Sequence, residues 1–200
     1  MKERYHTYLI VGAPGAGKGT QGRILGALPR YFHLACGDVF RSLDTRTSLG
    51  RIFVDYSSRG ELVPDEASIE LWKRTIHVAV ESNQFKPDID CLILDGIPRN
   101  ANQAALMEDL IDVKGVFHLV CPDHGQLVTR LRKRALKENR MDDASDSVIE
   151  QRLRTYEAET QPILDYYHNK PIHRVDAQQS PTLVLQEVVT RLVEDEARGV

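Results

Sequence analysis

Short apolar runs rich in β-branched residues alternate along the chain with longer stretches in which apolar residues recur at helical spacing. The runs predict strands at Tyr8–Val11, Phe32–Cys36, Cys91–Asp95, Val116–Cys121 and Ile172–Asp176. The longer stretches predict helices from Lys18 to about Leu28, Asp65 to about Ser82, Asn102 to Ile111, His124 to about Glu138, Ser147 to about His168, and Thr182 to about Ala197. Because the strand runs are apolar throughout, we expect an α/β fold with a five-stranded parallel sheet and helices on both faces.

The composition fits one ordinary globular domain over residues 1–200, with 42% hydrophobic and 28% charged residues. A net charge of −3 provides no broad basic field, so we expect neither nucleic acid nor a membrane surface as a partner. The N-terminus lacks a signal-peptide pattern and no apolar run approaches a membrane span, which favours a cytoplasmic protein. Cys36, Cys91 and Cys121 are widely spaced and fit reduced thiols, with no structural zinc site.

Residues Gly12 to Thr20, directly after the first predicted strand, read Gly-Ala-Pro-Gly-Ala-Gly-Lys-Gly-Thr. Glycines let the backbone N–H groups turn inward, and a following helix would present its positive end to the same anion. Lys18 would then supply charge to the outer phosphates, and the Thr20 hydroxyl would reach a phosphate-bound Mg²⁺. The residues from Gly17 to Gly22, together with Asp38, also match a dinucleotide-binding fingerprint. That interpretation is disfavoured because the first glycine of the fingerprint should lie at the end of the strand, whereas Gly17 comes well after Val11.

A second motif follows the third predicted strand, where Asp95 and Gly96 end an apolar run. In phosphate-loop proteins such an acid lies beside Mg²⁺ or its water shell, whereas alone the pair is more typical of a tight turn. Pro98, Arg99 and Gln103 change the balance, because Asp-Gly-x-Pro-Arg-x-x-x-Gln is the pattern of nucleoside monophosphate kinases. In a parallel sheet this motif would meet the glycine-rich loop at the carboxyl edge.

Arginines form the third group: Arg130, Arg134, Arg140 and Arg152. Helical spacing of the first two would also fit a solvated helix face. Between Arg130 and Arg140 arginines outnumber acidic residues, and the predicted phosphate site needs positive charge. Both observations favour a functional role for these arginines. The planar fork of arginine can hold two oxygens of a transferring phosphoryl group, and its face can stack on a base.

Together these segments resemble the adenylate kinase family, or a close nucleoside monophosphate kinase relative, over nearly the whole chain. The resemblance rests on Gly12–Gln21, His33–Asp38 with Arg41, Gly60–Asp65, Asp95–Gln103, Arg134–Asp143 and Arg152–Tyr156. It implies reversible transfer of the terminal phosphoryl group of Mg·ATP to AMP, giving two ADP, with ATP, AMP and ADP as partners. Because the acceptor phosphate is already ionised, no protein base is needed, and catalysis would rest on positioning and charge.

The resemblance also assigns roles to individual residues. The residues to which it assigns ATP binding are Gly15, Ala16, Gly17, Lys18, Gly19, Thr20, Arg130, Arg134 and Gln179. The residues to which it assigns AMP binding are Cys36, Arg41, Glu61, Leu62, Val63, Gly96, Ile97, Pro98, Arg99, Gln103, Arg140 and Arg152. The catalytic group would be Lys18, Arg99, Arg134, Arg140 and Arg152, with Mg²⁺ held through water near Thr20 and Asp95. Gln103 would bond the acceptor base, although a glutamine at such a position is otherwise an exposed helix residue.

The family pattern also divides the chain. It implies a core of 1–32, 66–134 and 146–200, an acceptor-binding segment of 33–65 and a short lid of 135–145, whose closure would exclude water. Only five residues separate Arg134 from Arg140, so the metal-binding insertion of long-lid members is absent.

Three departures from the family pattern bear on specificity. Cys36 replaces a threonine near the acceptor base, Ile97 replaces a phenylalanine, and one extra residue precedes Arg152, accommodated by a bulge or a later helix start. Because Cys36 is less polar than threonine, the acceptor base stays undecided, and a pyrimidine (UMP/CMP) monophosphate kinase is an alternative. A non-catalytic nucleotide-binding regulator is the alternative from another class, against which the retained basic residues argue. A monomer is the default, since no exposed apolar stripe is evident.

Overall fold

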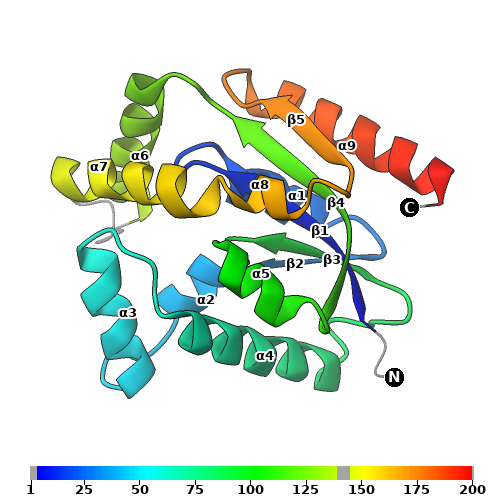
Figure 1. Cartoon of the computed structure of the whole chain (residues 1–200), viewed down its shortest axis with the longest axis horizontal. Coiled ribbons are helices and arrows are strands. Elements are labelled where there is room, and N and C mark those ends of the chain that lie inside the picture. The colour runs from blue at the N-terminus through cyan, green and yellow to red at the C-terminus, as the bar shows by residue number, and fades with distance from the viewer. Residues whose placement is uncertain (1–3, 139–144, 200) are drawn as a thin grey trace.

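The computed structural model describes residues 4–138 and 145–199 (Figure 1). In this part of the chain five parallel strands form one sheet in the order β2-β3-β1-β4-β5. The strands are β1 (Tyr5–Gly12), β2 (Tyr31–Ala35), β3 (Cys91–Asp95), β4 (Ile111–Val120) and β5 (Ile172–Asp176). The helices are α1 (Lys18–Leu25), α2 (Cys36–Arg41), α3 (Ser48–Ser58), α4 (Asp65–Glu81), α5 (Ala101–Met107), α6 (His124–Glu138), α7 (Asp146–Thr155), α8 (Ile163–Tyr166) and α9 (Pro181–Arg198), with a π-helical turn η2 (Tyr156–Thr160).

Both faces of the sheet are buried, as β1 shows most clearly. Leu9 and Val11 face a core cluster that includes residues of α4, α5 and α8, whereas Tyr8 and Ile10 face a second cluster with residues of α1, α6, α7 and α9. Helices α4 and α9 accordingly lie on opposite sides of the sheet in Figure 1. The predicted α/β class and the buried parallel sheet are confirmed, and the sheet brings the ends of β1, β2 and β3 to one edge.

Several predicted element boundaries are wrong. The predicted helix over 102–111 ends at Met107, because Ile111 begins β4 and pairs with Tyr5 of β1. The predicted helix over 147–168 is interrupted: Gln161 N–H donates to Tyr156 O across a π-helical turn, and Pro162 precedes the separate α8. The strand predicted to end at Cys36 stops one residue earlier, since Cys36 is the first residue of α2. Helix α1 likewise ends at Leu25 rather than Leu28.

Two glycines in α1 and at its end let this helix approach β2 closely. A Cβ atom on Gly22 would lie 2.3 Å from His33 Nε2, and one on Gly26 would lie 2.4 Å from His33 Cβ. These residues lower the helix propensity of the segment, but the close packing against His33 requires them. Tertiary packing therefore stabilises a helix that its own sequence does not favour.

We expect Gly26→Ala to lower the free energy of unfolding by about 1 kcal/mol, because overpacking, which typically costs about 1–3 kcal/mol, outweighs the smaller gain of about 0.4–1 kcal/mol from a less flexible unfolded chain. Gly26 has φ −68°, so its backbone would accept alanine and only space opposes it. The measurement is urea denaturation. Gly125→Ala, whose Cβ would meet only the Asp123 carboxylate at 3.3 Å, is the matched control and should change the midpoint little. A Gly26→Ala variant more stable than wild type would contradict this account of the packing.

Among the described residues, no helix is both long enough and apolar enough to cross a membrane. All three cysteines are free, and Cys36 and Cys121 are buried.

Candidate active site

The glycine-rich loop connects the end of β1 to the start of α1. Gly15 has φ +85° and Gly17 φ +97°, in the left-handed region that side chains disfavour. Gly17 is also the residue before α1, and no side chain caps this helix end. The positive end of α1 therefore has no side-chain cap, which suits an anion at this position.

Lys18 crosses this loop. Its Nζ donates to the carbonyl oxygens of Gly12 at 2.8 Å and Ala13 at 3.2 Å. Burial lowers the pKa of Lys18 to about 8; Asp95 opposes this shift, and the nearby Arg99, Arg134 and Arg152 add to it. The ammonium therefore lies among other cations, which indicates a site built for a strongly anionic ligand.

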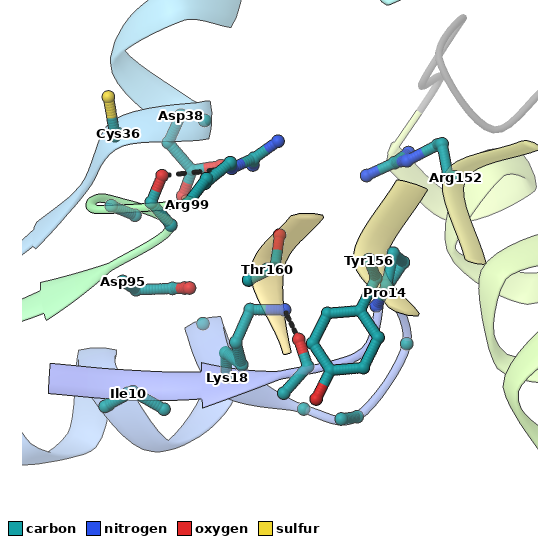
Figure 2. A pocket seen from close by; sticks show the side chains of 18 of the residues that line it. Ile10, Pro14, Lys18, Cys36, Asp38, Asp95, Arg99, Arg152, Tyr156 and Thr160 are labelled. Carbon is teal, nitrogen blue, oxygen red and sulfur yellow. Dashed lines mark hydrogen bonds between the residues drawn. The ribbon is translucent and has the colours of Figure 1, made fainter. Parts of the chain in front are cut away.

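A cavity of about 560 Å³ opens over the loop at the carboxyl edge of the sheet. Figure 2 shows Cys36, Asp38, Arg99 and Asp95 on one side of it and Arg152 on the other, with Lys18 between the two sides. The predicted site residues that line it are Gly15, Ala16, Gly17, Lys18, Gly19, Thr20, Cys36, Arg41, Glu61, Leu62, Val63, Asp95, Gly96, Pro98, Arg99, Gln103, Arg130, Arg134, Arg152 and Gln179. Ile97 belongs instead to a core cluster, at 2% exposure. Arg140 lies outside the described residues.

On the α2 side, two arginines are held in place by neighbouring oxygens. Arg41 Nη2 donates to Asp38 Oδ1 at 2.6 Å, and Arg99 Nε donates to Gly96 O at 3.0 Å. Gly96 has φ +79°, so the chain bends sharply directly after the strand, and this backbone is compatible with both interpretations of Asp95-Gly96. Cys36 is buried beside them, and burial raises the pKa of its thiol to about 12. This side of the cavity combines fixed guanidinium groups with a neutral sulfur.

Gln103 is only 1% exposed, so its interpretation as an exposed helix residue is wrong. Its Oε1 accepts a hydrogen bond from Arg99 N–H at 2.7 Å, and its Nε2 donates to Asp65 Oδ1 at 2.8 Å. A carboxamide has two hydrogens on nitrogen and two lone pairs on oxygen, so Gln103, which lines the cavity, has one of each that these two bonds do not use.

The opposite side of the cavity is formed by α6, α7 and the loop after β5. Arg130 Nη1 donates to Ala177 O at 2.8 Å, and Gln179 Nε2 donates to Asp176 O at 3.3 Å. Arg130 and Arg134 are half-buried at the cavity, whereas Arg132 is exposed and pairs with Asp146 at 2.7 Å. Arg130 and Arg134 therefore do not lie on a fully solvated helix face, whereas their neighbour Arg132 does.

Arg152 lies within the regular helix α7, which Ser145 caps by accepting from Val148 N–H. The extra residue before Arg152 therefore makes no bulge between Asp146 and Arg152. Gly60 packs against this helix: Thr155 Oγ1 donates to Gly60 O at 3.1 Å, and a Cβ atom on Gly60 would lie 2.9 Å from Val148 O. Gly60 has φ +72° as well, so conformation and space both require glycine here.

Sequence reasoning missed several cavity residues. Phe40 and Phe53 stack with ring centroids 5.3 Å apart and line the cavity. Tyr156, whose hydroxyl lies 3.1 Å from His118 Nε2, and Arg23, 3.8 Å from Asp38, line it elsewhere. Tyr156 ends the family motif Arg152–Tyr156, so the sequence did offer a reason to include it. No pattern pointed to Phe53, because the sequence analysis predicted no separate helix at the position of α3.

The residues present fit a Mg²⁺ ion that a bound nucleotide would carry. The Asp95 carboxylate is 9% exposed, and its Oδ2 lies 3.4 Å from where a Cβ atom on Gly19 would stand, directly over the first turn of α1 that carries Thr20. Carboxylate and hydroxyl oxygens suit Mg²⁺, which commonly takes one or two protein ligands beside phosphates and water. Within residues 4–138 and 145–199, no group of three or more His, Cys, Asp and Glu side chains forms a metal site.

A parallel sheet whose first strand runs through a glycine-rich loop into a helix, below a cavity lined by lysine and arginine, is the architecture of the phosphate-loop class of α/β proteins. The sequence profile of the family described as "Adenylate kinase" matches residues 10–172. The chain belongs to the adenylate kinase family.

Individual relatives agree with this assignment. An "Adenylate kinase" of Synechococcus sp. (strain JA-2-3B'a(2-13)) is 36% identical, over 93% of this chain and 95% of its own. An "Adenylate kinase" of Cyanothece sp. (strain PCC 7425 / ATCC 29141) is also 36% identical, over 92% and 95%. A "UMP-CMP kinase" of Gallus gallus is 34% identical, over 90% and 93%. The identity to the UMP-CMP kinase is similar, but adenylate kinases are the more frequent among these relatives.

Proposed function

We propose that this protein is an ATP:AMP phosphotransferase that transfers the terminal phosphoryl group of Mg·ATP reversibly to AMP, giving two ADP. The observation that carries the proposal is one cavity in which Lys18 of the glycine-rich loop, Arg99 after β3 and Arg152 of α7 face a common space. The family and its many adenylate kinase members support this activity. A cytoplasmic monomer is the corresponding expectation for the protein in the cell.

In this proposal the loop Gly15–Thr20 holds the phosphates of ATP, and Lys18 lies across the outer ones. Arg130 and the backbone near Gln179 contact the donor base. Arg134, Arg140 and Arg152 surround the transferring group and stabilise its charge in the transition state. Mg²⁺, held through water near Thr20 and Asp95, supplies neutralising charge between the phosphates when bound.

The acceptor end would use Arg41 and Arg99 for the AMP phosphate. Cys36, Gln103 and the main chain of Glu61–Val63 and Gly96 would then surround the base, with Pro98 shaping the turn. Because the phosphate oxygens of AMP are ionised near neutral pH, the attack needs no protein base, and alignment of donor and acceptor provides the rate. The acceptor-binding segment 33–65 and the lid 135–145 would close over both nucleotides to exclude water.

Coupled assays with AMP, UMP, CMP and GMP at fixed Mg·ATP test the proposal, and we expect AMP to be preferred. The pyrimidine kinase remains the second candidate, because Cys36 is less polar than threonine and the Gallus gallus relative is a UMP-CMP kinase. A preference for UMP or CMP would establish it. Tight ATP binding without diphosphate formation would instead favour the non-catalytic regulator.

Activity should depend on the charge of Lys18 above neutral pH. With a pKa of about 8, Lys18 of the free enzyme loses its proton as the pH rises through this value and can no longer attract phosphate. We expect kcat/KM for Mg·ATP, which reports on the free enzyme, to fall above about pH 8 and to approach a tenfold loss per further pH unit. Lys18→Arg, which stays charged, should lack this fall even if its activity is lower. Identical alkaline profiles for both proteins would contradict the assignment.

A further inference from the structure

Behind the cavity wall, three amide side chains converge on the carboxylate of Asp65, the first residue of α4. Asp65 Oδ1 accepts from Asn100 Nδ2 at 2.9 Å and from Gln103 Nε2 at 2.8 Å, while Oδ2 accepts from Asn102 Nδ2 at 2.6 Å. Burial acts to raise the pKa of Asp65, but these three hydrogen bonds outweigh it and lower the pKa. Asp65 is therefore ionised at neutral pH and can only accept hydrogen bonds.

This arrangement fixes the orientation of the Gln103 carboxamide. Its Nε2 faces a carboxylate oxygen that carries no hydrogen, and its Oε1 faces Arg99 N–H, which carries no lone pair. A half-turn of the carboxamide would place oxygen against oxygen and N–H against N–H. Both neighbours thus select one of the two orientations, and Gln103 is too deeply buried for water to replace them easily.

A fixed carboxamide presents its remaining donor and its remaining acceptor to the cavity in one order. Adenine and cytosine offer an amino donor beside a ring-nitrogen acceptor, whereas hypoxanthine, guanine and uracil offer an oxo acceptor beside a ring N–H donor. In hypoxanthine, guanine and uracil the donor and the acceptor are therefore exchanged relative to adenine and cytosine. Binding these oxo bases would require the other orientation of the Gln103 carboxamide. With the phosphate held by Arg41 and Arg99, the base could not turn over to compensate.

We propose that Asp65 is a positioning residue that locks the Gln103 carboxamide and so makes the acceptor site selective for amino bases over their oxo counterparts. The inference rests on the proposed function, because it requires the acceptor base to lie against Gln103. It adds a residue that contacts no substrate and a reason for the chemical class of base.

AMP and IMP test the lock directly, since they differ only in an amino or an oxo group at the position that Gln103 would read. For each protein kcat and KM are measured with both acceptors at saturating Mg·ATP. We expect the wild type to prefer AMP, and Asp65→Ala to lower the ratio of the two kcat/KM values by roughly tenfold, the typical effect of losing a hydrogen bond to a charged group. Asp65→Asn, which keeps an oxygen toward Gln103, should retain most of the preference.

Asn102→Ala is the matched control. It removes a hydrogen bond from the same carboxylate, but at Oδ2, and leaves the pair between Oδ1 and Gln103 intact. Its AMP/IMP ratio should equal that of the wild type. A purely structural role of Asp65 would instead reduce turnover of both acceptors equally, and an unchanged ratio in Asp65→Ala would overturn the proposal.

Should Asp65→Ala fail to fold, Asp65→Ser carries the same expectation, since serine is well tolerated in a first helical turn. The wild type is decisive on its own: equal use of AMP and IMP would overturn the lock while leaving phosphotransfer to AMP intact. An absence of turnover with every acceptor would mean that the proposed function, rather than the lock, has failed.

Discussion

Lys18→Met should reduce turnover at least about a hundredfold while the fold survives, because one preorganised electrostatic contact to a transition state is commonly worth a few kcal/mol. Methionine keeps the length of the side chain and removes its charge. The Lys18 ammonium donates hydrogen bonds to both Gly12 O and Ala13 O in the glycine-rich loop. The measurement is the steady-state rate of ADP formation at saturating Mg·ATP and AMP.

Lys73→Met provides the control, since Lys73 is an exposed residue of α4 away from the cavity, and its activity should equal that of the wild type. Thermal unfolding of both variants establishes that they are folded. A Lys18→Met enzyme within tenfold of the wild type would remove Lys18 from the proposed catalytic group.

Arg99→Lys should lower kcat/KM for AMP at least about thirtyfold, because a point charge cannot reproduce a planar fork. Arg99 Nε donates to Gly96 O at 3.0 Å, which fixes the plane of the guanidinium at the cavity wall. Lysine can keep this contact or face the phosphate, but not both. The KM for AMP should rise more than the KM for ATP, since the loop Gly15–Thr20 is the proposed holder of ATP.

Arg154→Lys serves as the control, because Arg154 is exposed on α7, where it pairs with Glu150 at 3.5 Å, and does not line the cavity. Initial rates with each nucleotide varied in turn separate the two KM values. An Arg99→Lys enzyme with weaker ATP binding and an unaltered KM for AMP would show that Arg99 serves the donor instead.

The sequence was most informative where one local pattern suffices. The strands Cys91–Asp95 and Ile172–Asp176 occur with the predicted boundaries, and continuous apolar runs also predicted a sheet buried on both faces. The glycine-rich loop needed no tertiary information either, since glycine at the positive φ angles of Gly15 and Gly17 is a backbone requirement. With the strand-end rule, these patterns were enough to predict where the cavity would lie.

Features that depend on distant partners could not be predicted in this way. Helical spacing continued to Ile111, but pairing with Tyr5 across the sheet decided that residue's conformation. The burial of Gln103 and its contact with Asp65 join residues 38 positions apart, and no periodicity reveals such a pair. The same holds for Gly60 and Thr155, which meet because α7 packs against the loop that follows α3. The role of each predicted site residue stays a prediction until the variants are measured.

The central place of β1 constrains how the protein can fold while it is being synthesised. Tyr5–Gly12 pairs with Cys91–Asp95 on one side and with Ile111–Val120 on the other, so the first strand made has no partner in the sheet until later strands emerge. Roughly 80 residues separate β1 from β3, which at about 5–20 residues per second is a wait of roughly 4–16 s on the ribosome. During that interval an apolar strand and its glycine-rich loop are open to chaperones and to self-association. Slow translation or scarce chaperone should therefore lower the yield of native protein more than its final stability suggests.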